Sequence, residues 1–470
     1  CIDCPLRVTM PPQTMPFHHT PIEERFRTVA ADRRRRAVSI FGLAFAPSFT
    51  SSGNSYSSST SSRYLLGCSS TGRICFWDLT DGDSGRGRAL AVLDVTAKQW
   101  GHHHSNHLDA SVMPIYHISF IEKKPDQQQQ HQQHTLLVVA VRGGVLLYRW
   151  SDIEAKLDRI AEGKDDACLT TTTKVQQSTC ILGDVHPITT LPVHPNPNPR
   201  ALGRIQCTSF DASNDILYGA ADDGFGTYVW DIEREELLGT LGRRSGVTNS
   251  LHSVVCSIDG GGKVITGGDG GQIDVWDGRQ LSLIESVDCS SCFRDGVAAA
   301  GTVLSDSGKV ANLDKVSLSI SSMDMTGSGD WAAIGGQCMR HPSTRRESSI
   351  TGGGGGEGGF VSLFHLPSRT LSSAYVTCES IHDIKYVDSF QKIATVGNEG
   401  VVSYWNSSDL STGRGCRAWI STPNAHCIAV DGAESSSAHG NGDSLFAVGG
   451  TGSMVDCFSN GSKVHSLDFA

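Results

Sequence analysis

A unit of strand-like segments recurs along this chain, and its recurrence constrains the fold more than any other feature. The clearest copy, "VVCSIDGGGKVITGGDGGQIDVWDGRQLSLIESVD", spans residues 254–288, and the copy before it spans 205–241. Each copy has an alternating strand, an apolar strand ending in small residues, a turn and a strand that carries an aromatic residue. That residue is Trp276 in one copy and Trp230 in the other. A recurring unit of this kind indicates a repeat architecture.

Five more copies align with these two and bring the total to seven. We expect the third strand of each copy to carry a structural aromatic residue, namely Trp77, Trp150, Trp230, Trp276, Phe364, Trp405 and Phe458. The spacing from Phe364 to Trp405 is 41 residues, and the spacing from Trp230 to Trp276 is 46. Both are close to the ~40–45 residues of a WD-type blade.

The seven copies predict an all-β fold, a seven-bladed WD-repeat β-propeller. Segments such as "LLVVAV" and "VVSYW" are apolar on both sides, so each blade has two apolar faces. Stacking the blades around an axis buries both faces, and closing the ring covers the terminal ones. We place the propeller at 37–470, with blades at about 38–97, 113–180, 204–241, 246–288, 316–377, 380–422 and 424–469.

The blades keep only part of the polar set of a model WD repeat, which is a Trp, a Ser or Thr, a His and a turn Asp. Thr266 and Trp276 in the fourth blade are such a remnant. We therefore expect apolar stacking to hold the blades together more than polar networks do. Residues 462–469 are placed to supply the outer strand of the seventh blade, which predicts closure by packing and not by strand exchange.

Outside the blades we expect a short N-terminal helix and disordered loop insertions. Residues 1–36 form an extension with a helix at about 21–35, because Thr20 is a capping residue and Pro21 fits the first helical position. We interpret Arg33 to Arg36 as its solvated end. We expect the low-complexity segments to be disordered loops, because they lack apolar residues that could pack. They lie at 51–62, 127–134, 194–200 and 348–359.

Charge and composition narrow the class of protein. The formal net charge of −10 argues against a protein that coats nucleic acid. No apolar stretch approaches the ~20 residues that span a bilayer. Many of the 15 cysteines lie in apolar strand-like segments, where a free thiol packs as a small hydrophobe. We infer a reducing compartment, cytoplasm or nucleus.

No catalytic, cofactor-binding or metal-binding residues emerge, so we expect no enzyme activity and no cofactor. The C-x-x-C pairs Cys1–Cys4 and Cys289–Cys292 each have the spacing of half a zinc site, but no second pair stands near either. His102, His103, His104 and His107 fit a solvated loop. The run "GGDGGQ" (267–272) opens onto a strand, so it predicts a hairpin turn and not a phosphate loop.

The order of the blades resembles subunit 6 of the THO complex, a part of the TREX mRNA-export assembly. The most specific match is the C-terminal "VGGTGSMVDCFSNGSKVHSLDF". The segments "GSGDWAAIGG" and "VSLFHLPSRT" are similar to the family's fifth blade, and "YLLGCSSTGRICFWDL" and "VITGGDGGQIDVWDGR" to its first and fourth. The chain departs from the family at Phe364, where the family has Trp, and at long insertions, which lie at 51–62, 98–112, 121–135, 151–203 and 289–315.

The resemblance implies a nuclear, non-catalytic scaffold that supports mRNA processing and export through protein–protein contacts. Its implied partners are other THO subunits, the coiled-coil subunits 5 and 7, with RNA reached only indirectly and with no membrane or small-molecule substrate. The partner-binding residues remain open. The alternative is a substrate receptor of a cullin-type ubiquitin ligase or another WD adaptor, because "VWDGR" (275–279) fits a W-D-x-R box. A third hypothesis is that the chain is an enzyme with a propeller fold.

Overall fold

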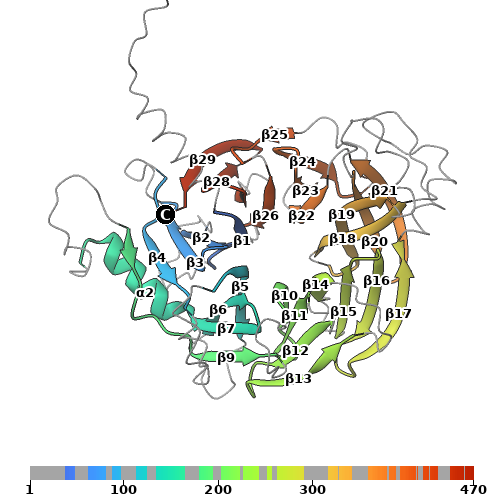
Figure 1. Cartoon of the computed structure of the whole chain (residues 1–470), viewed down its shortest axis with the longest axis horizontal. Coiled ribbons are helices and arrows are strands. Elements are labelled where there is room, and N and C mark those ends of the chain that lie inside the picture. The colour runs from blue at the N-terminus through green and yellow to red at the C-terminus, as the bar shows by residue number, and fades with distance from the viewer. Residues whose placement is uncertain are drawn as a thin grey trace, which may run out of the picture.

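Seven small sheets form a closed ring in the computed structural model of the chain (Figure 1). The structure describes residues 38–47, 62–80, 87–96, 113–123, 134–164, 179–193, 203–222, 226–242, 251–256, 262–289, 316–326, 328–340, 358–377, 380–387, 392–408, 410, 417–422, 424–431, 445–459 and 461–469. The ring is a seven-bladed β-propeller of the all-β class, as the repeats predict.

Each blade has four antiparallel strands that run in sequence order from the axis outwards. The innermost strands are β1 (Ile40–Phe45), β5 (Ile115–Lys123), β10 (Ile205–Asp211), β14 (Leu251–Cys256), β18 (Val316–Met325), β22 (Ile381–Val387) and β26 (Ala425–Val430). The second strands are β2 (Tyr64–Ser69), β6 (His134–Val141), β11 (Ile216–Ala221), β15 (Lys263–Gly268), β19 (Trp331–Arg340), β23 (Lys392–Gly397) and β27 (Leu445–Gly450).

The third and outer strands complete the blades. The third strands are β3 (Arg73–Asp78), β7 (Gly144–Arg149), β12 (Thr227–Asp231), β16 (Gln272–Asp277), β20 (Gly359–His365), β24 (Val401–Asn406) and β28 (Met454–Ser459). The outer strands are β4 (Ala91–Asp94), β9 (Thr189–Pro192), β13 (Glu236–Leu241), β17 (Ser282–Asp288), β21 (Thr370–Thr377), β25 (Arg417–Trp419) and β29 (Ser462–Asp468).

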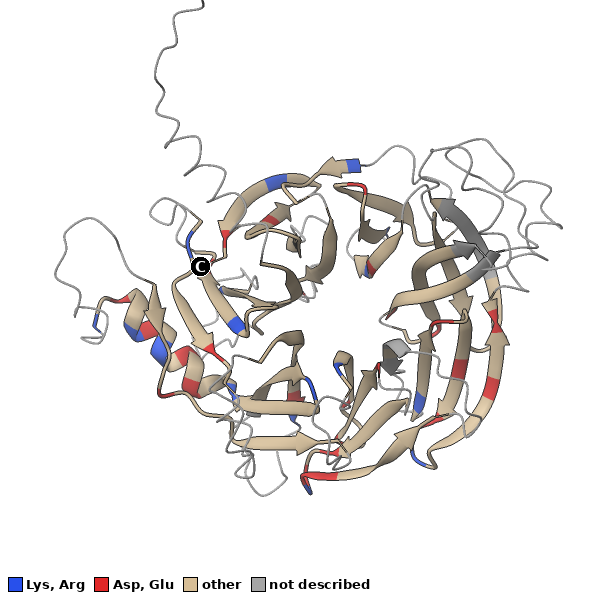
Figure 2. Cartoon of the chain, viewed as in Figure 1, with Lys and Arg blue, Asp and Glu red and all other residues tan. Residues whose placement is uncertain are grey.

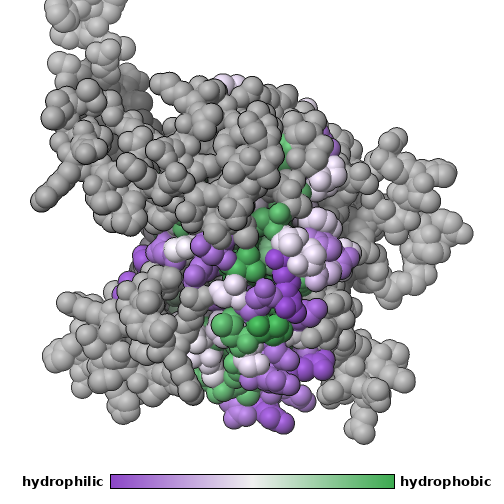
Figure 3. Space-filling view, turned by 90° about the vertical axis from the view of Figure 1, so that its right-hand side faces the viewer, coloured by the Kyte–Doolittle hydropathy of each residue, from purple (hydrophilic) through white to green (hydrophobic). Residues whose placement is uncertain are grey.

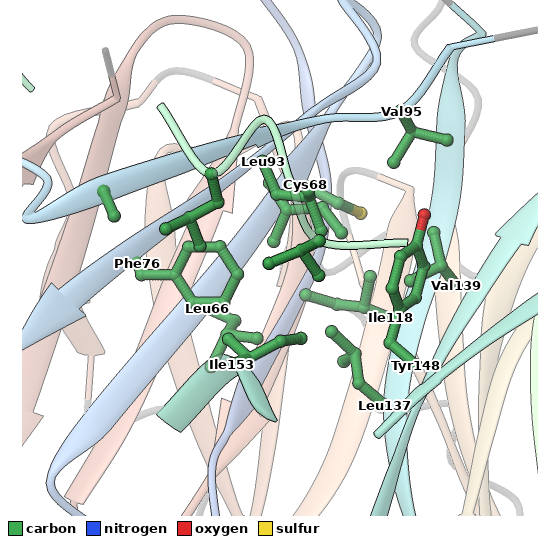
Figure 4. Packing of buried hydrophobic residues seen from close by; sticks show 14 of the residues in the cluster. Leu66, Cys68, Phe76, Leu93, Val95, Ile118, Leu137, Val139, Tyr148 and Ile153 are labelled. Atoms are coloured by element: carbon green, nitrogen blue, oxygen red, sulfur yellow. The ribbon is translucent and has the colours of Figure 1, made fainter. Parts of the chain in front are cut away.

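The core is divided into seven hydrophobic clusters, one at each junction between neighbouring blades. Figure 4 shows the first junction, where Leu66 and Phe76 of blade one face Leu137 and Tyr148 of blade two. All four side chains are fully buried. Apolar burial contributes roughly 25 cal/mol per Å², so each blade is stabilised by both of its neighbours, as the apolar strands predict.

The ring closes where blade seven meets blade one. All four strands of blade seven come from the C-terminal segment, and β29 is its outer strand, as the sequence predicts. The N–H of Gly452 donates to the carbonyl of Val38 at 2.8 Å, and the N–H of Asp468 donates to that of Gly87 at 2.5 Å. Blade packing and these main-chain hydrogen bonds therefore join the two ends, with no strand exchanged.

The predicted end of blade two is wrong. The segment 113–180 was expected to contain the whole blade, but its outer strand β9 lies further on, at Thr189–Pro192. Between β7 and β9 the chain forms helix α2 (Trp150–Ala161) and then β8 (Cys180–Ile181), which adds a fifth, parallel strand to blade one. The predicted insertion at 151–203 thus contains ordered structure, because its apolar residues pack against two blades.

Helix α2 covers the junction between blades one and two. Its buried residues Trp150, Ile153 and Leu157 follow a helical spacing. The Trp150 ring meets Tyr64 of blade one at 6.2 Å and Phe120 of blade two at 5.1 Å, both edge to face. On its outer side, Asp158 accepts hydrogen bonds from Arg63 and Tyr64, each at 2.6 Å. The helix thereby connects the first two blades.

Several expectations concern residues outside the described ranges. They are the N-terminal helix at 21–35, the run Arg33–Arg36 and most or all of the four low-complexity segments. Within the ranges that the structure does describe, no helix is long and apolar enough to cross a membrane.

Candidate functional site

The seven innermost strands line a channel on the propeller axis, with a cavity volume of about 470 Å³. In Figure 1 these strands surround the centre of the ring. All seven contribute lining residues, among them His117, Asp324, His382, Lys385 and His426. The channel is concave and carries several ionisable groups, so we take it as the candidate site.

Every innermost strand has a β-bulge at its second strand residue or at the matching place in the longer β18. In β1, for example, Ile40 pairs with Ser69 and Gly42 pairs with Cys68, so Phe41 has no partner. The bulged residues are Phe41, Tyr116, Gln206, His252, Ser321, His382 and His426. A bulge bends the strand and redirects a side chain. The seven bulges therefore recur at one equivalent position in each of the strands that line the channel.

Four of these bulged residues form an arc of rings across four consecutive blades. Ring centroids lie 5.9 Å apart for Tyr116 and Phe41, 6.0 Å for Phe41 and His426, and 5.3 Å for His426 and His382. The guanidinium of Arg204 lies over Tyr116 at 5.7 Å. Such contacts are individually weak, but together they tie blades six, seven, one, two and three at this end.

Asp383 joins three blades deeper in the channel. Its carboxylate accepts the hydroxyl of Ser322 in blade five at 2.6 Å and the N–H of Ile428 in blade seven at 2.7 Å. It also accepts the N–H of Ile384 at 2.9 Å. Burial raises the pKa of Asp383, and Lys385 and these hydrogen bonds act against that rise. Because its oxygens are occupied by protein donors, Asp383 acts as a structural link.

Lys385 lies two residues further along the same strand and also lines the channel. Its ammonium lies 3.4 Å from Asp324, whose other oxygen accepts the N–H of Tyr386 at 2.7 Å. Burial alone would lower the pKa of Lys385, but the carboxylates of Asp324 and Asp383 outweigh it and raise that pKa. Lys385 is thus a fixed cation between two partly exposed carboxylates of the channel, Asp324 and Asp383.

Two histidines of the channel, His117 and His426, are held neutral. Burial, and then the charge of Lys385, lower the pKa of His117 to about 3. Burial, and then His382, lower the pKa of His426 to about 4. His117 Nδ1 lies 3.0 Å from the hydroxyl of Thr208 in blade three, and His382 Nδ1 donates to the carbonyl of Ala425 at 2.8 Å. His117 and His382 therefore form hydrogen bonds that link neighbouring blades.

The predicted blade aromatics lie in the core and not in the channel. Trp77, Trp230, Trp276, Phe364, Trp405 and Phe458 each occupy the penultimate position of a third strand. Trp150 does not, because β7 ends at Arg149 and Trp150 begins α2. The equivalent residue in blade two is Tyr148, which pairs with Leu137 as Trp77 pairs with Leu65.

Polar remnants of the WD repeat are present in two blades. Trp276 Nε1 donates to the hydroxyl of Thr266 at 2.9 Å, which is the pair expected in blade four. Blade six has the same arrangement between Trp405 and Thr395, at 2.8 Å. In blade four the Asp after the aromatic, Asp277, accepts two main-chain N–H groups of the next turn. Such Asp caps favour the turn that leads to the outer strand.

The sequence motifs weighed for metal or phosphate chemistry lie in turns or outside the described ranges. The run 267–272 contains the turn between β15 and β16, as predicted, and Gly271 has a positive φ of 65° there. Cys289 is buried, whereas Cys1, Cys4, Cys292 and the histidines at 102–107 are outside the described residues. Among the residues described, no three His, Cys, Asp or Glu side chains gather as metal ligands would.

No protein-family model matches the chain, and no curated protein matches it.

Proposed function

We propose that this protein is a non-catalytic scaffold subunit of the THO complex that supports mRNA processing and nuclear mRNA export through protein–protein contacts. The proposal combines the seven-bladed propeller with the ordered sequence resemblance to THO subunit 6. A propeller of this type presents two ends and an outer rim to partners, and its fold alone does not fix its function.

The observation that carries the proposal is the position of the resembling segments in the blades. "YLLGCSSTGRICFWDL" and "VITGGDGGQIDVWDGR" each contain the second and third strands of a blade, β2–β3 and β15–β16. The C-terminal segment contains β28 and β29, which close the ring. The resemblance thus follows consecutive blade strands in blades one, four and seven, as expected if it extends over a common propeller.

The test is affinity purification of the tagged full-length chain from nuclear extract, followed by mass spectrometry. The proposal predicts recovery of THO subunits, including the coiled-coil subunits 5 and 7, and nuclear staining of the tagged chain. A matched preparation carrying Trp77→Ala, which we expect to weaken the ring, serves as the control for a folded propeller. Recovery of a cullin adaptor without THO subunits would contradict the proposal.

The second candidate is a substrate receptor of a cullin-type ubiquitin ligase. It is favoured by one observation, the exposure of Arg279 in the turn after β16, where a W-D-x-R box would present its arginine. Under this alternative, Arg279→Ala abolishes recovery of the cullin adaptor. Under the THO proposal, the same substitution leaves recovery of THO subunits unchanged.

A further inference from the structure

The outer strands of blades three and four carry bulges that expose apolar side chains. In β13, Val229 pairs with Gly239 and Trp230 with Leu237, so Leu238 is the unpaired residue. In β17, Ile284 is unpaired in the same way, between Leu283 and Glu285. Leu238 is 41% exposed, Leu283 43% and Ile284 42%. We name these three residues the rim patch.

The rim patch crosses the junction between the two blades. A Cβ built on Gly239 would lie 3.0 Å from Cδ1 of Leu281, so β13 touches the segment that leads into β17. Figure 3 looks at the side of the ring where β17 lies and shows apolar surface bordered by hydrophilic surface. Exposed apolar patches with polar borders are typical of protein interaction sites.

Acidic residues surround the rim patch. Segments 231–238 and 277–285 together contain six carboxylates and two guanidinium groups. Glu233, Glu235 and Glu236 are exposed at the start of β13, whereas Glu285 is paired with Arg369 at 2.5 Å. In Figure 2 the beginning of β13 is red, and red bands mark β17. This border favours a partner with basic side chains, because complementary charge guides and orients association.

The bulges also indicate how such a partner docks. A bulge interrupts the row of main-chain groups on an outer strand and so disfavours the addition of another strand. Contacts must then come from side chains, and an amphipathic helix offers apolar residues at i, i+3, i+4 and i+7. We propose that the rim patch binds an amphipathic helix that has leucines on one face and lysines or arginines beside them. The proposal specifies a class of partner for the scaffold proposed above. Its biological meaning rests on that proposed function, whereas the binding itself does not.

The test measures binding of a defined helical probe to the purified full-length chain. The probe is a fluorescein-labelled 18-residue peptide (about five turns) with leucines at helical spacing and lysines elsewhere. Matched peptides replace lysine by glutamate or scramble the leucines. We expect fluorescence anisotropy to show binding of the basic amphipathic peptide, with affinity at least about tenfold above both matched peptides and reduced by added salt.

Two variants locate the binding. Leu238→Gln with Ile284→Gln should weaken binding about tenfold or more, whereas Val464→Gln should leave it unchanged. Val464 is the matched control because it is the bulged residue of β29 and is 45% exposed. No binding of the basic peptide, equal binding of the acidic one, or equal loss in the control variant would overturn the inference. Failure of the THO proposal would show instead as missing subunits in the nuclear purification, with this peptide result unaffected.

Discussion

Trp77 and Asp468 are 391 residues apart in the sequence, yet the indole Nε1 of Trp77 donates to the main-chain carbonyl of Asp468 at 3.3 Å. The same indole ring packs edge to face against Phe469, with centroids 5.9 Å apart. A side chain of the first blade therefore holds the last residues of the last blade. Ring closure depends on this contact together with the main-chain hydrogen bonds beside it.

Replacing Trp77 by Ala should destabilise the whole ring and not only blade one. Trp77 is 1% exposed, and truncating a buried Trp to Ala costs about 3–5 kcal/mol of unfolding free energy. Urea denaturation followed by tryptophan fluorescence and circular dichroism measures the loss. Val464→Ser, at an exposed position, should change the free energy of unfolding by less than about 0.5 kcal/mol. A wild-type midpoint for Trp77→Ala would refute the closure contact.

Lys385→Met should raise the pKa of His117. The ammonium of Lys385 contributes to the low pKa of His117, second to burial. The substitution removes that charge and keeps the burial, so the pKa should rise from about 3 but stay below the ordinary value of about 6.5. NMR titration of the imidazole carbon signals measures it, with Lys463→Met as control. An unchanged pKa would show that the two groups do not interact.

The propeller should lose stability as pH falls from about 6.5 towards 4. His117 and His426 have folded pKa values of about 3 and 4, below the unfolded value of about 6.5. The unfolded chain therefore binds protons that the folded chain does not bind. This difference lowers the free energy of unfolding by about 1–2 kcal/mol per histidine at pH 5. The raised pKa of Asp383 acts in the opposite sense, because the folded state protonates first.

Urea midpoints at pH 7 and pH 5 check this prediction. The double variant His117→Asn with His426→Asn should show a clearly smaller drop between the two pH values than the wild type. If wild type and variant drop equally, carboxylates elsewhere account for the acid sensitivity.

Leu157→Ala should destabilise the chain by about 2–5 kcal/mol, because Leu157 lies on the inner face of α2 and is fully buried. A solvated loop at 151–203 would instead tolerate the change. Arg159→Ala, on the exposed face of the same helix, is the matched control and should stay within about 0.5 kcal/mol of wild type. Thermal unfolding of the three proteins distinguishes the ordered helix from a loop.

The repeat predicted the ring, the blade count and six of the blade aromatics. The aromatic residue of blade two was predicted wrongly because "LYRW" contains two aromatics, Tyr148 and Trp150. Trp is the more common residue at this position of a WD strand. The two-residue turn at Arg142 and Gly143 decides the register and ends β7 before Trp150. Helix α2 was missed although apolar residues recur at 150, 153, 157 and 160, a helical spacing.

The channel could not be predicted in the same way. Each bulge is a one-residue shift of register, which the strand pairing reveals and the apolar pattern does not. Asp324 lies in blade five, whereas Asp383 and Lys385 lie on one face of a strand in blade six, and only the packing of the two blades brings the three together. The histidines at 382 and 426 could have indicated the channel from the sequence. Each lies at the second residue of an innermost strand, where a polar ring beside buried residues needs a hydrogen-bond partner.

Hydrogen–deuterium exchange of the full-length chain tests ring closure by the C-terminal strand most directly. The account predicts slow exchange in peptides from β29 and from β1, and parallel loss of protection in both when Trp77 is replaced by Ala. Rapid exchange of the 462–469 peptide in the wild type, while β1 stays protected, would contradict closure by the chain's own last strand.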